Sequence, residues 1–213
     1  FFFKQKTAYE IRLSLVGSEM CIRDSTILRF MDTGAHGLVV PWVNTAEQAE
    51  AAVRSVKYQP RGMRGLAGVR AADYAQTTPL GDYIKKANAE TLVVLQIESK
   101  EAMDNLPAIL QVPYVDVIFI GPNDLRYRMR AADGTFPTAA EHEAAIQEVI
   151  RIGRATGTPT GIHTLSATEA LERAGQGMQF LAIGSELSFL TREAERTLNQ
   201  LDPDRESKSL AKY

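Results

Sequence analysis

Cysteine, long apolar runs and an excess of either charge are nearly absent from this chain of 213 residues. The single cysteine, Cys21, excludes an internal disulfide framework and fits a protein of the reducing cytoplasm. No apolar stretch approaches the roughly 18 residues that a membrane helix requires, so no membrane partner is indicated. The formal net charge is only -2 and no basic block occurs, so a nucleic-acid partner is not indicated either.

What is present is the composition of an ordinary globular domain, with 45% hydrophobic and 23% charged residues. The length suits one α/β domain with a sizeable core. Short apolar runs alternate with segments of helical periodicity. Strands are predicted near residues 38–41, 92–97, 117–120, 160–163 and 180–184, and helices over 46–58, 80–89, 100–110, 138–156, 166–174 and 187–201. Residues 63–78 and 126–137 are predicted to be irregular connections.

Strands that alternate with helices at this spacing indicate parallel βα units with right-handed crossovers. The pattern contains about five such units, whereas a complete (β/α)8 TIM barrel has eight. The predicted fold class is therefore α/β, an incomplete barrel made of about the last five units. No repeat or low-complexity linker divides it, so one domain is expected over residues 26–201, followed by a charged, mobile tail over 202–213.

Residues 1–25 show neither helical nor strand periodicity, and they lack the apolar core and cleavage site of a signal peptide. The string resembles translated sequencing-adapter read-through of the kind attached to truncated gene models. We expect this segment to be non-native and to stand in place of the natural amino-terminal part. A divergent but genuine terminus is the alternative.

Two apolar runs each end in a carboxylate. The run LVVLQIE ends at Glu98, and VIFIGPND ends at Asp124. Continuous β-branched runs indicate strands buried on both faces, and such a strand places its terminal acid at the rim of the sheet. Two carboxylates there suit a hard divalent cation. Ordinary structural roles remain open, with Glu98 paired to an arginine and Asp124 capping a helix.

Gln96 and Glu98 lie two residues apart and should face the same side of their strand. Gln96 is then placed to contact a ligand or to orient a water molecule. In the turn that follows the second run, Gly121 permits close backbone approach and Pro122 stiffens the turn. The amides of Asn123 and Asp124 are candidates to face a carboxylate.

Together, LQIESKEAMDNLPAIL and VDVIFIGPNDL resemble the metal-ligand region of the HpcH/HpaI aldolase family, which are class II pyruvate aldolases. The resemblance continues upstream through GAHGLVVPWVNTAEQAEAAVRSVKYQPRGMRG and downstream through GIHTLSATEALERAGQGMQFLAIGSEL. It implies a barrel of the phosphoenolpyruvate/pyruvate superfamily type. The family includes aldolases for 4-hydroxy-2-oxoheptanedioate, 2-keto-3-deoxy-L-rhamnonate and 2-dehydro-3-deoxyglucarate.

The resemblance implies roles for particular residues. Glu98 and Asp124 match the carboxylates that hold Mg²⁺, Mn²⁺ or Co²⁺, and Gln96 matches a substrate-contacting glutamine. Asn123 stands where a backbone group contacts the pyruvate carboxylate, within the turn that Gly121 and Pro122 begin. Asp32 matches an acid that raises the basicity of a catalytic histidine.

That histidine and a transition-state arginine precede the equivalent of Thr26 in the family, so this chain lacks their counterparts. His36, His142 and His163 do not match the histidine. His163 is expected to be a polar rim residue without a catalytic part, and His142 is expected to lie solvated on an exposed helix face.

The implied reaction is metal-dependent retro-aldol cleavage of a 4-hydroxy-2-oxo acid to pyruvate and an aldehyde. The lysines considered as Schiff-base candidates, Lys85, Lys86 and Lys100, fall on predicted helices rather than at strand ends, which argues against a Schiff-base aldolase. A lyase of the citrate-lyase-β or malyl-CoA-lyase type and a non-catalytic truncated fragment are the alternatives. The resemblance also implies a homo-oligomer, commonly a hexamer of exchanged barrels. The apolar last helix then packs on a neighbouring subunit or covers its own barrel.

Overall fold

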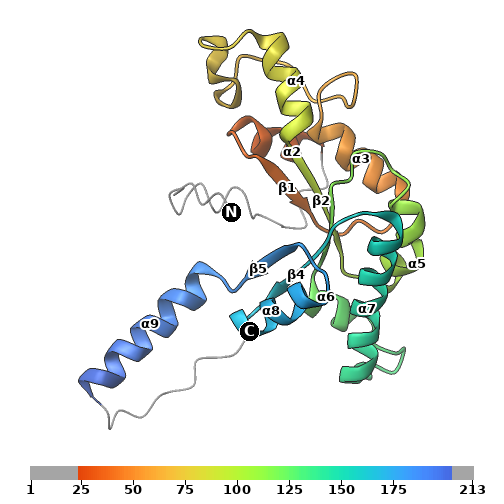
Figure 1. The fold of residues 1–213 in the computed structure, drawn as a ribbon, viewed down its shortest axis with the longest axis vertical. Helices are drawn as coiled ribbons and strands as arrows, with labels where there is room; N and C mark the ends of the chain where they lie inside the picture. Colours follow the sequence, from red (N-terminus) through yellow and green to blue (C-terminus); the bar gives the residue numbers. More distant parts are fainter. Residues whose placement is uncertain (1–23, 203–213) are drawn as a thin grey trace.

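The computed structural model describes residues 24–202 of the chain, so nearly all of the adapter-like segment and the tail lies outside the described residues. Five parallel strands form one sheet in the order β1-β2-β3-β4-β5. Figure 1 shows this sheet as a half-barrel with most of the helices on its outer side. The strands are β1 (Gly37–Val40), β2 (Leu92–Ile97), β3 (Val117–Ile120), β4 (Thr160–Thr164) and β5 (Phe180–Ile183). The predicted partial barrel is thereby confirmed.

Eight α-helices and one short 3-10 helix surround the strands in the described part. They are α2 (Asp24–Asp32), α3 (Ala46–Val56), η2 (Arg70–Ala75), α4 (Leu80–Glu90), α5 (Lys100–Ile109), α6 (Pro122–Arg128), α7 (Ala139–Thr156), α8 (Ala167–Gly175) and α9 (Glu186–Leu201). Among these helices, none is both long and apolar enough to cross a membrane. Two predicted connections contain helix: η2 lies within 63–78, and α6 extends into 126–137.

Side-chain caps explain where several helices begin. The hydroxyl of Thr45 accepts a hydrogen bond from the backbone N–H of Gln48 at 3.3 Å. The reciprocal bond differs, because the Gln48 side chain accepts from the N–H of Asn44 rather than that of Thr45. Thr138 and Glu141 form the complete reciprocal pair at the start of α7.

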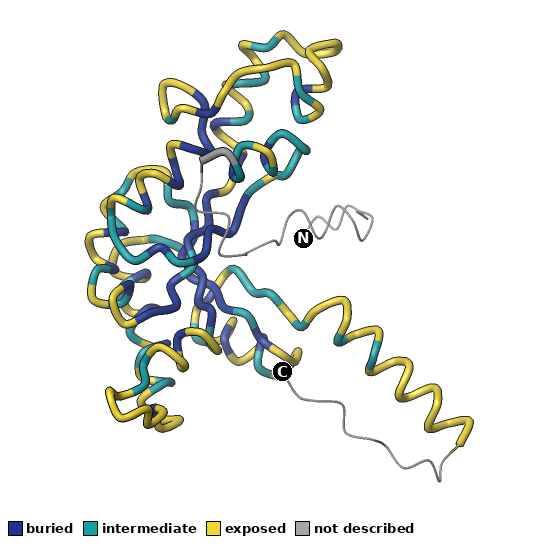
Figure 2. The backbone as a smooth tube through the Cα atoms, turned by 180° about the vertical axis from the view of Figure 1, so that it is seen from behind, coloured by how far each residue is buried: buried dark blue, intermediate teal, exposed yellow. Residues whose placement is uncertain are grey.

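Alternation along each strand divides the sheet into two faces. On β2, Val93, Leu95 and Ile97 are buried in the main core beneath the helices, whereas Val94 belongs to a second cluster on the inner face. Figure 2 shows the buried backbone running along the strands at the centre of the molecule. The inner face is therefore where Gln96 and Glu98, which share the parity of Val94, must point.

Helix α9 leads away from the sheet and contains no buried residue (Figure 1). Leu187 and Leu190 expose 65% and 68% of their surfaces. The helix therefore does not cover the half-barrel of its own chain, which leaves packing on a neighbouring subunit as the remaining prediction for its apolar side chains.

Candidate active site

Glu98 follows β2 directly and is almost completely buried, with 2% of its surface exposed. Its Oε1 accepts the backbone N–H of Trp42 at 2.9 Å, and its Oε2 accepts from Nε2 of Gln96 at 2.6 Å. The predicted shared orientation of Gln96 and Glu98 is thus present. Within residues 24–202, Glu98 makes no ion pair with a lysine or arginine, so two neutral donors hold it.

Burial, hydrogen bonds and nearby charges all act on the pKa of Glu98. Burial raises the pKa of Glu98, and the negative charge of Asp124 acts in the same direction. The two neutral donors and the positive charge of Arg128 only partly oppose this rise in the pKa. A cation at this position would favour the ionised carboxylate.

Asp124 lies exposed in the first turn of α6, which begins directly after β3. Because β2 and β3 are neighbouring parallel strands, their carboxyl ends meet at one rim, and the charge of Asp124 acts on Glu98. The described residues contain no group of three or more His, Cys, Asp or Glu placed to hold a metal. Mg²⁺ commonly uses one or two protein carboxylates and completes its shell with water and substrate oxygens, so two suffice.

Gly121 leaves room at the end of β3 for the side chains of Gln96 and Glu98. A Cβ at this position would lie 2.5 Å from Nε2 of Gln96 and 2.7 Å from Oε2 of Glu98. Any side chain would force at least one of these groups to move. Pro122 then occupies the first turn of α6, where its missing N–H removes no helical hydrogen bond, and Asn123 is exposed beside it.

A cavity of about 580 Å³ opens on the inner face beside these residues. Its floor is apolar, and Phe119 and Phe180 meet edge to face there with ring centroids 5.7 Å apart. The backbone of Phe180 can approach β4 closely because Gly161 has no Cβ; a Cβ there would lie 2.0 Å from the backbone oxygen of Phe180. The polar lining is supplied by Gln96, Asn123, Asp124, His163, Ser185 and Glu186.

His163 projects from β4 into this cavity. Its Nε2 lies 3.0 Å from the carbonyl oxygen of Gly184, which can only accept, so the proton is on Nε2. In the neutral imidazole, Nδ1 is then the nitrogen that can accept a hydrogen bond. The prediction that His163 has no catalytic part stays a prediction.

His142 differs from the prediction of a solvated residue on an exposed face. It is half-buried, and its Nε2 has no hydrogen-bond partner among the described residues. Burial lowers the pKa of His142, and its interaction with the backbone of Pro122 opposes this. The helix turns this side chain toward the start of α6, which periodicity on α7 alone did not indicate.

Asp32 ends α2 and lies near the amino end of β1, opposite the rim that carries Glu98. Within this chain the structure therefore does not bring Asp32 and Glu98 together. Its Oδ1 accepts from Nη2 of Arg64 at 2.8 Å, and the Arg64 guanidinium also lies 4.5 Å from the ring centre of Tyr58. Arg64 was assigned to an irregular loop, and nothing in its sequence context indicated that it is buried.

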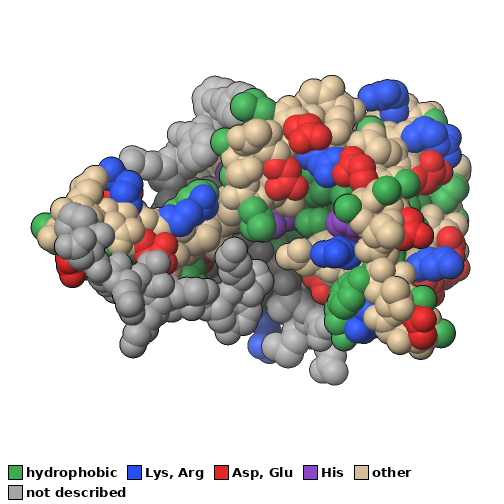
Figure 3. Space-filling model, turned by 90° about the horizontal axis from the view of Figure 1, so that it is seen from below, with side chains coloured by type: hydrophobic (Ala, Val, Ile, Leu, Met, Phe, Trp, Pro, Cys, Tyr) green, Lys and Arg blue, Asp and Glu red, His purple; other side chains and the backbone are tan. Residues whose placement is uncertain are grey.

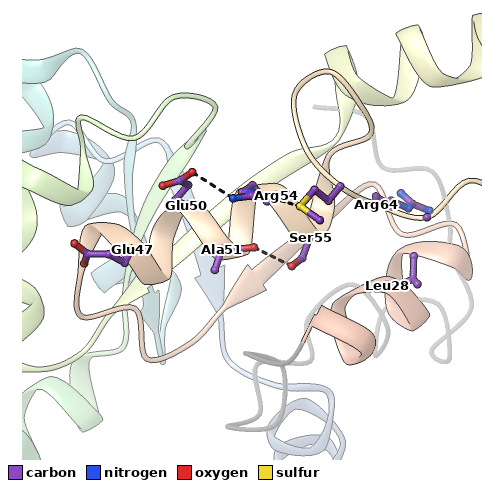
Figure 4. Close-up of a pocket in the computed structure, with 9 residues that line it drawn as sticks. Leu28, Glu47, Glu50, Ala51, Arg54, Ser55 and Arg64 are labelled. Carbon is purple, nitrogen blue, oxygen red and sulfur yellow. Dashed lines mark hydrogen bonds and ion pairs between the residues drawn. The ribbon is translucent and has the colours of Figure 1, made fainter.

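A second cavity, of about 430 Å³, lies on the exposed side of α3 (Figure 4). Glu50 and Arg54 form a 3.8 Å ion pair along its wall. Since this cavity is in the outer helical layer, it is separate from the inner face where Glu98 points. On the face shown in Figure 3, acidic and basic side chains are interspersed, without an extended basic patch.

Comparison with known proteins gives a consistent set of relatives. The family model described as HpcH/HpaI aldolase/citrate lyase matches residues 1–192. The 4-hydroxy-2-oxo-heptane-1,7-dioate aldolase of Escherichia coli (strain ATCC 8739) is 39% identical over 169 residues, and that of Klebsiella pneumoniae is 40% identical over 169 residues. Both alignments cover 79% of this chain and 63% of the relative, so the chain spans less than two thirds of their length.

Solved structures share the fold. A HpcH/HpaI aldolase/citrate lyase family protein from Burkholderia cenocepacia J2315 superimposes with a TM-score of 0.75 at 28% identity, covering 84% of this chain and 70% of the other. A HpcH/HpaI aldolase from Desulfitobacterium hafniense DCB-2 has a TM-score of 0.76 at 24% identity, covering 88% and 71%. The second likeness is evidence of the fold alone.

Proposed function

The chain belongs to the HpcH/HpaI aldolase/citrate lyase family, and we propose that it is part of a cytoplasmic, metal-dependent pyruvate aldolase. The substrate is a 4-hydroxy-2-oxo acid, which is cleaved to pyruvate and an aldehyde. The observation that carries this proposal is the packing of Gln96 and Glu98 against Gly121, with Asp124 close enough to act electrostatically on Glu98, beside a cavity on the inner face of a half-barrel that Gln96 and Asp124 line.

Glu98 and Asp124 are the residues that would hold Mg²⁺, Mn²⁺ or Co²⁺. Their carboxylate oxygens are the donors that hard divalent ions prefer, and the lack of a side chain at Gly121 leaves room for Glu98 and Gln96 beside it. The bound cation would act as a Lewis acid toward the 2-oxo acid.

The protein groups perform the positioning. Gln96 donates from Nε2 to Glu98, and its Oε1 has no hydrogen-bond donor among residues 24–202, so this oxygen can accept from a substrate hydroxyl or a water molecule. The exposed turn at Pro122 and Asn123 is assigned to the substrate carboxylate. Phe119 and Phe180 exclude water from the apolar side of the cavity, which strengthens the polar contacts made opposite them.

Proton transfer from the 4-hydroxyl requires a base. We assign it, from the family resemblance, to a histidine before the equivalent of Thr26. The resemblance also matches Asp32 to the acid beside that histidine, but Asp32 is bound to Arg64 at the end of β1 opposite the rim that carries Glu98, so no step of the reaction is assigned to it.

A retro-aldol assay tests the proposal. The release of pyruvate from 4-hydroxy-2-oxo acids is measured with added Mg²⁺ or Mn²⁺, for this chain and for a version extended to the length of its relatives. The extended protein should be active, and Glu98→Gln and Asp124→Asn should each abolish most of the activity. Glu101→Gln, which removes an exposed carboxylate from α5, is the control.

Activity that survives both substitutions would refute the metal assignment. Cleavage of an acyl-CoA without pyruvate release would replace the aldolase with a lyase of the citrate-lyase-β or malyl-CoA-lyase type. If the extended protein is active and this chain is not, the chain is an inactive fragment of the enzyme.

The exposed apolar residues of α9 support a homo-oligomer, which we propose to be the hexamer implied by the family resemblance. Leu187, Leu190 and Leu201 expose 65%, 68% and 78% of their surfaces. Light scattering of the extended protein should give the mass of an oligomer. Leu190→Glu should lower that mass, because it places a charge in an apolar contact.

A further inference from the structure

The first residue to consider is Trp42, which follows β1 and adopts a left-handed backbone conformation with φ of 59°. Such a conformation is unfavourable for a bulky side chain and persists only where the surroundings hold it. In this conformation the N–H of Trp42 reaches Oε1 of Glu98 at 2.9 Å. The strained backbone is therefore what presents this donor to the carboxylate.

The second residue is Arg128, in the last turn of α6. Its guanidinium lies 4.2 Å from the ring centre of Trp42, which is within cation–π distance. Asp124 lies four residues earlier on the same helix, where an ion pair would be the ordinary choice. Within residues 24–202, Arg128 forms no ion pair or hydrogen bond, so its contact with Trp42 takes the place of that pair.

These contacts connect the two candidate metal-binding carboxylates through one residue, Trp42. The backbone of Trp42 holds Glu98 at the end of β2, and its ring holds Arg128, which is on the helix that carries Asp124. We propose that Trp42 and Arg128 are positioning residues that set the placement of Glu98 and Asp124 for a divalent cation. This inference rests on the proposed function for the identity of the ligand.

A positioning role and a purely electrostatic role of Arg128 predict opposite changes in cation affinity when Arg128 is replaced. Removing the positive charge of Arg128 would by itself strengthen cation binding at the neighbouring carboxylates. If Arg128 instead acts through Trp42, its removal must weaken cation binding, because Glu98 loses its fixed donor. Groups that orient metal ligands typically change metal affinity by about 10- to 100-fold when removed.

Trp42 is the only tryptophan of the chain, so its fluorescence reports on this contact directly. The experiment titrates Mn²⁺ into the full 213-residue chain and follows the quenching of that fluorescence, with far-UV circular dichroism as the check on folding. Arg128→Met should raise the Mn²⁺ dissociation constant about tenfold. Arg128→Lys should retain most of the affinity, because an ammonium group also binds an aromatic face.

Arg130→Ala is the matched control. Like the Arg128 substitution, it removes one positive charge and one cation–π contact from this region, here the contact of Arg130 with the Tyr127 ring at 3.6 Å. It leaves the contact between Arg128 and Trp42 in place. Its Mn²⁺ affinity should equal or slightly exceed that of the parent chain. A second test does not depend on tryptophan fluorescence, because Mn²⁺ binding is measured by electron paramagnetic resonance. The Mn²⁺ dissociation constant of Trp42→Phe should be within about twofold of that of the parent chain, and that of Trp42→Ala should be about tenfold higher than the parent value.

The outcomes separate the two proposals. Mn²⁺ binding that is lost in Glu98→Gln but unchanged or tighter in Arg128→Met supports the metal site and overturns the positioning pair. Saturable binding weakened in both variants supports both. If the parent chain binds no Mn²⁺ while folded, the metal site and the positioning pair are overturned together.

Discussion

The guanidinium of Arg64 and the carboxylate of Asp32 lie 2.8 Å apart, with the arginine side chain 1% exposed and the aspartate 27% exposed. Nε of Arg64 is buried and has no hydrogen-bond partner among the described residues. The ion pair with Asp32 is therefore the main interaction that offsets the burial of the guanidinium charge. Removing one member of such a pair leaves a buried charge that is poorly solvated.

Asp32→Asn is therefore expected to lower the free energy of unfolding by about 3 kcal/mol. Urea denaturation followed by circular dichroism measures the change. Asp82→Asn, which breaks an exposed pair with Lys85, is the control and should change it by less than about 0.5 kcal/mol. An Asp32 variant as stable as the parent would show that the pair contributes nothing to the fold.

Gly121→Ala should damage the candidate site without unfolding the chain. The added methyl group would overlap Gln96 and Glu98, so at least one of them must move. We expect Mn²⁺ binding to weaken by about tenfold or more, as measured by electron paramagnetic resonance. Gly81→Ala has open space around its Cβ on α4 and should bind Mn²⁺ normally while gaining up to about 1 kcal/mol of stability. Equal binding in the two variants would contradict the close packing around Glu98.

The pair formed by Glu143 and Arg173 predicts how stability depends on pH. Two hydrogen bonds of 2.6 and 2.7 Å join them, and the guanidinium lowers the pKa of Glu143 from 4.5 to about 2. Because the folded pKa is the lower one, the stabilisation is complete above pH 4.5 and is lost as the pH falls toward 2.

Thermal unfolding at pH 6 and pH 3 tests this. Glu143→Gln should destabilise at pH 6 by about 1 kcal/mol, since the partly exposed pair is screened by solvent, and should differ less from the parent at pH 3. Glu148→Gln removes an exposed pair from the same helix and should have a smaller effect. A Glu143 variant whose deficit is the same at both pH values would contradict the assignment.

Lys57 should be a structural residue. Its side chain is 3% exposed, and its ammonium group donates to the carbonyl oxygens of Asn88 and Thr91 where α4 leads into β2. Lys57→Met would remove the Lys57 donor from the carbonyl oxygen of Thr91, whereas that of Asn88 would keep Nη1 of Arg61 as a donor. The substitution should destabilise by on the order of 2 kcal/mol in urea denaturation. Lys85→Met, which changes an exposed lysine, should be nearly neutral, and a similar loss in both would show that burial is not the cause.

The strands were predictable because their periodicity is a direct consequence of burial. Residues 92–97 and 117–120 form strands over the predicted ranges, since continuous β-branched runs have few other stable arrangements. The shared face of Gln96 and Glu98 followed from the two-residue repeat of a strand. The order of the strands followed from the rule that βα units connect neighbours.

Other features depend on contacts between distant segments, which local patterns do not encode. The bond from Trp42 to Glu98 spans 56 residues, and the pair of Arg64 with Asp32 spans 32. A left-handed tryptophan is also contrary to backbone preference, so no propensity would indicate it. The helical start of the connection after Asp124 was missed because α6 is only 7 residues long, too short for a periodic signal.

The arrangement of glycines around the cavity sets the direction in which its size can change. At Gly121 and Gly161 any larger residue meets atoms that are already in place, whereas truncating Phe119 or Phe180 would simply remove bulk. Directed evolution of this scaffold should therefore enlarge the cavity by single changes at the two phenylalanines, whereas changes at the two glycines need compensating changes nearby. Under the aldolase function that we propose, acceptance of bulkier aldehydes is accordingly the easier trait to select.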